Sequence, residues 1–390
     1  MFGSIYIGLS GLTAYSEGLK AVSNNVSNLN TSGFKASDVT FSDVYGAGSS
    51  GGLSYSVSSP SGHGVTLDQI STNFQQGELR QTDRDLDLAI DGNGFFVLLD
   101  EGQTYYTRTG SFAIDDDGYL VLSGTDHRLA ILDDSGRPAS VNVDDELSSP
   151  PEETTKIKFA QNLSSTATEF TIPDVKVYDE RGEAHLWTLK FSREETVFDE
   201  WTLKVTDDKG VEIGTKTLKF AAGAVDPLTE TLNFADSASG LSVAFDFSGV
   251  TSNSEGTVSS LRAADVDGRA TGSISSLAVN EKGQLEITYS NAEKKSLGSI
   301  ALADFRDAQK LQQRSGGLFA DNGFAQVQYL SAEDTRVGTI LSKRLEASNV
   351  DLGSQFAELI LIQRGFQASS QIISVSNDMI QQLFGIRGQG

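Results

Sequence analysis

The stretch of this chain that most restricts its fold is residues 349–384, where an apolar side chain recurs at every seventh position. The recurring residues are Leu352, Leu359, Phe366, Ile373 and Ile380. This spacing places them in one column of a long helix. The next column is mostly small or polar and reads Phe356, Gln363, Ser370, Asn377 and Phe384. An ideal helix drifts by about 20° per heptad, so a narrow column that stays in register predicts partner helices wound around it.

A second heptad pattern lies at the other end of the chain. Its residues alternate at spacings of three and four, as the a and d positions of a coiled coil do, and they are Ile5, Gly8, Leu12, Tyr15, Leu19, Val22, Val26 and Leu29. We predict a helix over residues 5–29. It should end at Asn30-Thr31-Ser32-Gly33, because Asn and Gly adopt the left-handed conformation that terminates helices.

Polar residues mark the ends of both predicted helices. Asn24, Asn25 and Asn28 are poor helix formers, so they either cap and fray the end of the first helix or bond to neighbouring helices. Ser348-Asn349-Val350-Asp351 has the spacing of a capping box and marks the start of the second helix. Each apolar column is too narrow for an ordinary core. We therefore expect both segments to be largely disordered in a free subunit and to become helical on assembly.

Composition excludes several classes of function. The chain has 390 residues, of which 38% are apolar, so two or three domains with real cores are expected. A net charge of −23 argues against binding to nucleic acid or to an anionic membrane surface. The absence of cysteine excludes disulfides and thiolate metal sites. No apolar run reaches about 20 residues, and the first residues lack the pattern of a secretory signal peptide. We expect a soluble chain that would leave the cytoplasm by another route.

The middle of the chain contains a series of turns that end in glycine. Five turns place Asp or Asn three residues before Gly, between apolar runs; they begin at Asp115, Asp133, Asp179, Asp207 and Asn280. An Asp or Asn at the first turn position bonds the backbone ahead of it, and Gly supplies the positive φ that closes a hairpin. The flanking runs alternate between apolar and polar residues. These patterns predict a set of antiparallel hairpins.

Three other features could suggest chemistry but have simpler interpretations. The glycine run at Gly46 to Gly52 formally matches a dinucleotide fingerprint and a nucleophile elbow, yet no strand and helix flank it as those sites require, so we interpret it as a linker. The acidic turns lack the alternating donors and closing Glu of a calcium loop. His63, His127 and His185 lie far apart with no ligand spacing. We predict no catalytic, cofactor-binding or metal-binding residue, and no enzyme activity.

These patterns predict a mainly β protein with paired helical termini and nested antiparallel β domains. Residues 1–33 and 346–390 form the terminal coiled-coil assembly domain, and residues 34–72 form an extended arm. Residues 73–139 and 270–345 form an inner β domain, into which residues 140–269 insert as an outer β domain. The predicted self-assembly residues are the apolar members of the two heptad patterns: Ile5, Leu12, Tyr15, Leu19, Val22, Val26, Leu29, Leu352, Leu359, Phe366, Ile373 and Ile380.

Motifs at both ends resemble those of the bacterial flagellar rod and hook family. Residues 22–35 (VSNNVSNLNTSGFK) are similar to its N-terminal signature, and Ser348-Asn349-Val350-Asp351-Leu352 with residues 363–368 (QRGFQA) is similar to its C-terminal signature. Residues 83–96 and 107–112 resemble its shared β domain. The chain departs from the family pattern at Gly365, which should loosen the helix by about 1 kcal/mol.

The large insertion after Ala139 is similar to that of the hook members of the family. The resemblance implies a structural subunit that assembles through its terminal helices into a flexible, curved tube, a universal joint that transmits torque from rod to filament. It also implies type III export without a cleaved signal peptide and an extracellular place in the flagellum. The implied partners are further copies of the chain, the rod, the hook cap, the hook–filament junction and the export apparatus, with no nucleic acid, membrane insertion or cofactor.

Two alternatives remain open at this stage. A distal rod subunit of the same family would share the terminal motifs but lacks a large inserted domain. A secreted β-rich adhesin or carbohydrate-binding module would explain Trp187 and Trp201 in the inserted domain, but it would not explain heptads at both ends.

Overall fold

The computed structural model describes residues 2–45, 62–194, 199–237, 239–254 and 258–387. The chain divides into two compact units. The first unit contains residues 1–145, 277–286 and 296–390, and the second contains residues 146–276 and 287–295. The finer division predicted from the sequence, with boundaries at residues 33, 72, 139, 269 and 345, stays a prediction. None of the described helices is long and apolar enough to cross a membrane.

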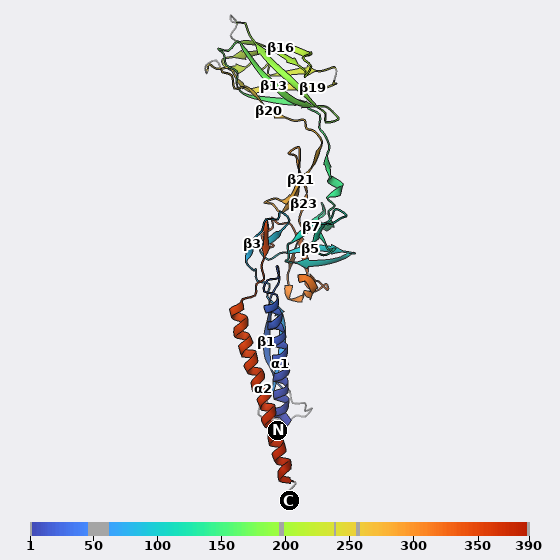
Figure 1. Cartoon of the computed structure of the whole chain (residues 1–390), viewed down its shortest axis with the longest axis vertical. Coiled ribbons are helices and arrows are strands. Elements are labelled where there is room, and N and C mark those ends of the chain that lie inside the picture. Colours follow the sequence, from blue (N-terminus) through green and yellow to red (C-terminus); the bar gives the residue numbers. More distant parts are fainter. Residues whose placement is uncertain (1, 46–61, 195–198, 238, 255–257, 388–390) are drawn as a thin grey trace, which may run out of the picture. The chain divides into compact units, whose positions relative to one another are not determined.

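Two long helices lie at the ends of the chain and belong to the first unit. Helix α1 spans Phe2–Ser27 and helix α2 spans Leu352–Arg387, and they lie side by side (Figure 1). Both predicted helices are confirmed, with boundaries that differ by two to three residues. Helix α2 begins later than predicted because Asp351 caps it: its Oδ1 accepts a 2.7 Å hydrogen bond from the Ser354 amide.

The segment predicted as an extended arm contains two paired strands instead. Strands β1 (Ser37–Tyr45) and β2 (Gly62–Thr72) are antiparallel, and the register between them shifts twice. Pairing satisfies the backbone groups that a bare arm would leave to water. The glycine run interpreted as a linker lies outside the described residues. The predicted arm is therefore corrected to a strand pair, which packs along α1.

One ten-stranded sheet forms the β part of the first unit. Its order is β25-β26-β6-β5-β9-β8-β7, with β10 beside β9 and β24 between β5 and β27. The strands are β5 (Phe95–Asp100), β6 (Gln103–Thr107), β7 (Phe112–Ile114), β8 (Leu120–Leu122), β9 (Arg128–Leu132), β10 (Pro138–Ser140), β24 (Leu302–Phe305), β25 (Gln312–Arg314), β26 (Leu318–Ala320) and β27 (Val327–Leu330). Because β24 pairs with β5, segments on either side of the second unit in the sequence share one sheet.

Smaller elements lie outside the ten-stranded sheet. Strand β3 (Leu79–Gln81) pairs with β29 (Arg344–Glu346), and β4 (Leu88–Asp91) pairs with β28 (Thr339–Ser342). A four-stranded sheet has the order β11-β21-β22-β23, formed by Ser148–Ser149, Gly272–Val279, Gln284–Tyr289 and Lys294–Ser299. The short 3-10 helices are η1 (Asp144–Glu146), η2 (Ala308–Lys310) and η3 (Ser315–Gly317). The two β-pairs that include β3 and β4 bring the segment before α2 back to the segment after β2.

The second unit is built on a nine-stranded sheet around one apolar core. Its order is β13-β14-β15-β16-β17-β19-β12-β20, with β18 beside β19. The strands are β12 (Lys156–Asn162), β13 (Glu169–Tyr178), β14 (Ala184–Ser192), β15 (Glu200–Thr206), β16 (Glu212–Ala221), β17 (Ala224–Val225), β18 (Thr231–Ala235), β19 (Ser242–Thr251) and β20 (Arg262–Val266). One pairing departs from the predicted antiparallel pattern: β12 and β19 run parallel, because the strand that enters the unit lies beside a strand that follows it by a long connection.

Trp187 and Trp201 are completely buried in the core of the second unit. Alternation along β14 and β15 turns both rings to the same apolar side as Leu189 and Leu203. A carbohydrate-binding surface needs exposed aromatic rings. The two tryptophans therefore give no support to the carbohydrate-binding alternative.

The predicted hairpin turns are confirmed in atomic detail. In all five turns the first side chain accepts hydrogen bonds from the amides two and four residues ahead, as the Asp207 Oδ1 does from Lys209 at 3.0 Å and from Val211 at 2.6 Å. The others begin at Asp115, Asp133, Asp179 and Asn280. The closing glycine has positive φ in each of them, for example 79° at Gly210. The acidic residues that begin these turns thus serve the backbone.

We predict an acid-sensitive link between β12 and β19. The Lys156 amine donates to Asp246 at 2.8 Å, and this hydrogen bond, followed by those from Ser248, lowers the pKa of Asp246 from 3.8 to about 2. Because the ionised form is favoured in the folded chain, its stabilisation is present above about pH 4 and is lost as the pH falls toward about 2. Over that window, the free energy of unfolding should fall by about 1–2 kcal/mol more in the wild type than in Asp246→Asn.

Urea unfolding followed by tryptophan fluorescence measures this difference, since Trp187 and Trp201 are the only tryptophans and both report on the second unit. Asp208→Asn, at an exposed turn position, is the matched control and should follow the wild-type pH dependence. Equal acid sensitivity of Asp246→Asn and wild type would contradict the assignment.

Candidate assembly surface and its polar anchor

Helices α1 and α2 pack closely because small residues line their contact. A Cβ atom added at Gly8 would lie 2.8 Å from the Ile373 side chain and 3.1 Å from the Ser369 carbonyl. A Cβ atom at Gly365 of α2 would overlap the Tyr15 ring. Glycine thus lets the two backbones approach more closely than larger residues allow. Gly365, where the chain departs from the family pattern, was expected to loosen the helix. In the structure it makes room for the Tyr15 ring.

The column of α2 that is most buried differs from the predicted one. The buried residues are Gln355, Ile362, Ser369 and Ser376, which also recur every seventh position. Of the predicted column, Leu359, Ile373 and Ile380 are half-buried, whereas Leu352 and Phe366 are exposed. The predicted column concerns contacts between subunits and stays a prediction. Within the chain, close packing against the glycines of α1 favours small side chains. In the sequence, Gly8, Gly11 and Gly18 were the signal from which this close contact could have been predicted.

The predicted residues of α1 are covered to different degrees. Val22 is fully buried and Leu19 is exposed, while the remaining ones are half-buried: Ile5, Leu12, Tyr15, Val26 and Leu29. Both apolar columns therefore find part of their burial within one chain, which agrees with the predicted pairing of the helical termini. The expectation that both segments are largely disordered in a free subunit stays a prediction. Small residues at the contact make the pairing possible, and neither column is covered completely.

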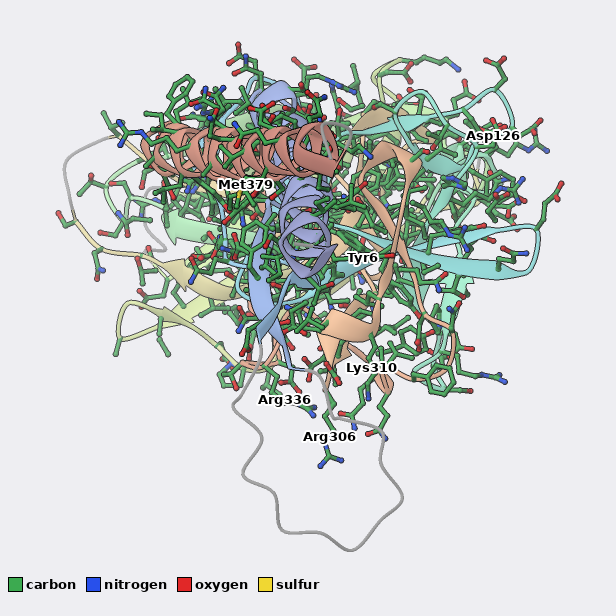
Figure 2. All side chains as sticks on the ribbon, turned by 90° about the horizontal axis from the view of Figure 1, so that it is seen from below. Tyr6, Asp126, Arg306, Lys310, Arg336 and Met379 are labelled. Atoms are coloured by element: carbon green, nitrogen blue, oxygen red, sulfur yellow. The ribbon has the colours of Figure 1, made fainter. Side chains whose placement is uncertain are left out.

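Apolar side chains remain exposed along both helices. We call this set the apolar helix surface, and it consists of Tyr6, Ile7, Leu9 and Leu19 of α1 and Leu352, Phe356, Ile360, Leu361, Phe366, Ile372, Val375 and Met379 of α2. Tyr6 and Met379 are labelled in Figure 2. A groove of about 400 Å3 between α1 and the β1–β2 pair adds Val44, Val65 and Leu67 to this side of the unit. So much exposed apolar surface is typical of a protein–protein contact.

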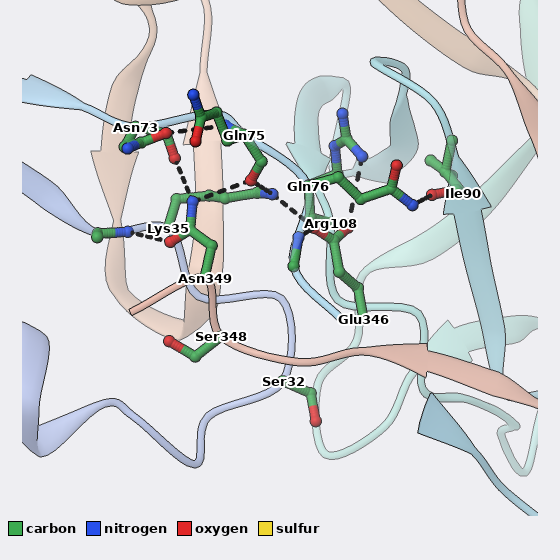
Figure 3. A network of polar contacts seen from close by, with 12 residues as sticks. Ser32, Lys35, Asn73, Gln75, Gln76, Ile90, Arg108, Glu346, Ser348 and Asn349 are labelled. Atoms are coloured by element: carbon green, nitrogen blue, oxygen red, sulfur yellow. Dashed lines mark hydrogen bonds and ion pairs between the residues drawn. The ribbon is translucent and has the colours of Figure 1, made fainter. Parts of the chain in front are cut away.

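A buried cluster of charged groups, which we call the polar anchor, joins the helices to the β part of the first unit (Figure 3). Glu346 of β29 lies at its centre. Its Oε1 accepts hydrogen bonds from the Lys35 Nζ at 2.6 Å and from the Gly77 amide at 2.8 Å. The Arg108 Nη1 lies 3.4 Å from the Glu346 Oε2. All three charged side chains are almost completely inaccessible to solvent.

Backbone groups complete the anchor. Lys35 donates a second hydrogen bond to the Gln75 carbonyl at 2.8 Å, and Arg108 donates to the Gly92 carbonyl at 2.9 Å. The Glu346 carbonyl accepts a bond from the Gly33 amide at 2.8 Å. Burial is the main cause that lowers the pKa of Lys35 and of Arg108, and the nearby carboxylate opposes it. Each charge is hydrogen-bonded, as burial requires.

Two asparagines extend the anchor to the last turn of α1 and to the segment just before α2. Asn25 is fully buried: its amide donates to the Ser37 carbonyl and to Gln355 of α2, each at 2.9 Å, and it accepts from the Ser37 amide. Asn349 accepts from the Ala36 amide and donates to the carbonyls of residues 73 and 75. The sequence left open whether these asparagines cap the end of the first helix or bond to neighbouring helices. Asn25 does the latter, through Gln355 of α2. Asn28, just after α1, instead bonds back to Asn24 in the last turn of the helix.

The groups weighed for chemistry stay apart in the structure. His127 faces Asp100 at 3.1 Å, and His185 faces Asp179 at 3.6 Å, each as a single pair. Within the described ranges, no group of three or more His, Asp or Glu side chains could hold a metal ion.

Comparison with protein families matches four stretches of the chain. A model described as flagella basal body rod protein matches residues 5–35, and one described as flagellar basal body rod FlgEFG protein C-terminal matches residues 341–386. Models described as flagellar hook protein FlgE/F/G D1 domain and flagellar basal body protein FlaE D2 domain match residues 89–172 and 140–324. The two terminal matches contain α1, α2 and much of the polar anchor.

Whole proteins are also similar in sequence. A flagellar hook protein of Brucella suis biovar 1 (strain 1330) is 30% identical over 99% of this chain and 99% of its own length. That of Salmonella typhimurium is 29% identical over 97% of this chain and 98% of its own. That of Treponema pallidum is 25% identical over 99% of this chain and 100% of its own length. The similarity thus extends along the full length of these proteins.

The polar anchor predicts a large effect of one substitution. Glu346→Gln removes the charge that compensates both Lys35 and Arg108 while preserving shape, so it should lower the free energy of unfolding of the first unit by about 3 kcal/mol. Chemical denaturation followed by circular dichroism measures the change. Glu78→Gln breaks an exposed pair with Arg80 and should have little effect. Equal stability of the two variants would show that the anchor contributes nothing.

The close contact of the helices predicts that Gly8 cannot accept a large side chain. Gly8→Leu should separate α1 from α2 and increase amide hydrogen exchange around Ser369, since overpacking costs about 1–3 kcal/mol. Gly3→Leu is the matched control, because a Cβ atom there would meet nothing within 4 Å. Unchanged exchange in Gly8→Leu would mean that the helices do not pack in the free chain.

Proposed function

This chain belongs to the flagellar hook protein family and is a structural subunit of the hook, and we propose that it polymerises through its terminal helices into a flexible tube that transmits torque. One observation carries this proposal: the apolar helix surface stays exposed after α1 and α2 have packed together. Neighbouring subunits of the same sequence would cover it with their own helices. Assembly then supplies the burial that one chain provides only in part.

The polar anchor supports a mechanical role in the proposed tube. Lys35 follows α1, Glu346 precedes α2, and Arg108 follows β6, so the anchor connects both helices to the ten-stranded sheet. A buried, hydrogen-bonded ion cluster holds its geometry more firmly than a surface pair. Force applied to the β part of a subunit would therefore reach both helices together. Bending of the tube would then occur between subunits rather than at this junction.

The remaining roles follow from family membership. The chain has its place in the flagellar hook, where subunits polymerise together with other flagellar components. The specific partners we propose are the rod, the hook cap, the hook–filament junction and the type III export apparatus. Export through that apparatus, without cleavage of a signal peptide, would bring the subunit outside the cell. A purely structural role, without enzyme activity, agrees with the way in which the first acidic residue of each described turn bonds the backbone.

Phe366 tests the role of the apolar helix surface. It belongs to the predicted column and is 38% exposed in the single chain. Phe366→Asp should prevent polymerisation of the purified full-length protein with little change in monomer melting temperature, because its charge would be buried only between subunits. Electron microscopy and light scattering measure assembly, and calorimetry measures monomer stability.

Leu228→Asp is the matched control. Leu228 lies in the second unit and is 91% exposed, so the same kind of change there should leave assembly intact. Normal polymers of Phe366→Asp would refute the proposed role of this surface. A large drop in its monomer melting temperature would place Phe366 within the fold of the subunit instead.

A further inference from the structure

A cleft on the β part of the first unit combines a cation with an exposed aromatic ring. Its volume is about 280 Å3, and it lies among the end of β24, η2 and the start of β27. The lining side chains are Arg306, Asp307, Lys310, Phe324, Ala325 and Gln326. Figure 2 shows Arg306 and Lys310 on the same side of the molecule. Arg and aromatic residues are the types that dominate binding energy at protein interfaces.

Arg306 differs from the cations around it. Lys310 pairs with Asp307 at 3.1 Å, and Arg336 pairs with Asp334 at 2.8 Å. Within the described part of the chain, Arg306 has only a long, 3.5 Å contact with the Gln326 side-chain oxygen and no ion pair. Its guanidinium is exposed and keeps most of its donors for another molecule.

The aromatic side of the cleft is held in place in the free subunit. Phe324 is 70% exposed. Its loop is fixed by Asp321, whose Oδ1 accepts hydrogen bonds from the amides of Gly323, Phe324 and Ala325 at 2.9 to 3.1 Å. Among the described residues, no ion pair joins Asp321 to Arg306. A ring held in position loses little entropy on binding.

A complementary surface lies elsewhere on the same unit. Asp100 at the end of β5 and Glu101 in the turn that follows line a depression of about 510 Å3 together with Asp126, and Asp100 also faces His127 at 3.1 Å. Arg128 also lines it, but its guanidinium stacks on the Tyr119 ring at 3.6 Å. Figure 2 shows Asp126 on a different side of the molecule from Arg306. We call these three carboxylates the acidic edge.

From these two surfaces we infer that the Arg306–Phe324 cleft of one subunit binds the acidic edge of a second copy of this chain; the inference rests on the polymerisation proposed above. Contacts that repeat from subunit to subunit in a helical assembly are heterologous, so they need two different, complementary surfaces on different sides of one molecule. Copies that each carry a net charge of −23 repel one another on average. An unpaired guanidinium that meets carboxylates gives a local attraction that also fixes the register.

A charge-swap experiment on the full-length protein tests the inference. Arg306→Glu and Asp126→Arg should each raise the critical concentration for polymerisation, measured by sedimentation, by about tenfold. The double variant Arg306→Glu/Asp126→Arg should return most of the way to the wild-type value, since each contact then again joins opposite charges. Raising the salt concentration should weaken wild-type assembly more than it weakens assembly of Arg306→Glu.

Arg80→Glu is the matched control, because it makes the same charge change at an exposed arginine and should leave the critical concentration near the wild-type value. Wild-type assembly by Arg306→Glu would overturn the inference while leaving the proposed function intact. Failure of the double variant to recover would also overturn it, because the acidic edge would then not be the partner. If the wild-type chain itself does not polymerise, the proposed function fails and this inference fails with it.

Discussion

The carboxylate of Glu346 is the point on which the arrangement of the first unit depends. It compensates Lys35 and Arg108 in a region closed to solvent, and it accepts a hydrogen bond from the Gly77 backbone. An isolated charge in such a place would cost several kcal/mol, so the three side chains stabilise one another only together. Because Lys35 follows α1 and Glu346 precedes α2, the C-terminal end of α1 and the N-terminal end of α2 are held next to the same sheet.

The helix pair that extends from this anchor is only partly self-sufficient. Glycine and serine at the contact bring α1 and α2 close, and this leaves large apolar side chains such as Phe356 and Leu361 on the flanks. An ordinary globular protein would bury these residues under further helices of its own. In a hook subunit the missing helices would come from neighbouring copies. The same surface thus explains both why a single chain has some helical order and why it would gain more from assembly.

The β-sheet regions of the two units suit a tube that bends. The two units have separate cores, one around Phe95 and Phe319 and the other around Trp187 and Trp201. Each core is completed by strands within its own unit, so neither depends on contacts that bending would disturb. Contacts between β parts of neighbouring subunits would then rest on exposed polar and charged groups. Such contacts give register with modest affinity, which agrees with the charge-based contact inferred for Arg306.

The sequence by itself determined the local structure of this protein. Heptad spacing predicted both terminal helices, Asp-to-Gly spacing predicted the hairpin turns, and alternation predicted the buried faces of strands such as β14. These signals succeed because each depends on residues a few positions apart, where the periodicity of the backbone relates the sequence directly to one face of an element.

Only the tertiary structure decided which elements meet. Lys35 and Glu346 are 311 positions apart, and no local pattern distinguishes them from surface charges. The parallel pairing of β12 with β19 and the β1–β2 pair likewise depend on distant partners. For α2, the sequence indicated a helix with an apolar column, but the contact with α1 selected the column of Gln355, Ile362, Ser369 and Ser376 instead. Burial depends on the shape of the opposing surface as well as on hydrophobicity, and glycines on α1 made small side chains the better fit.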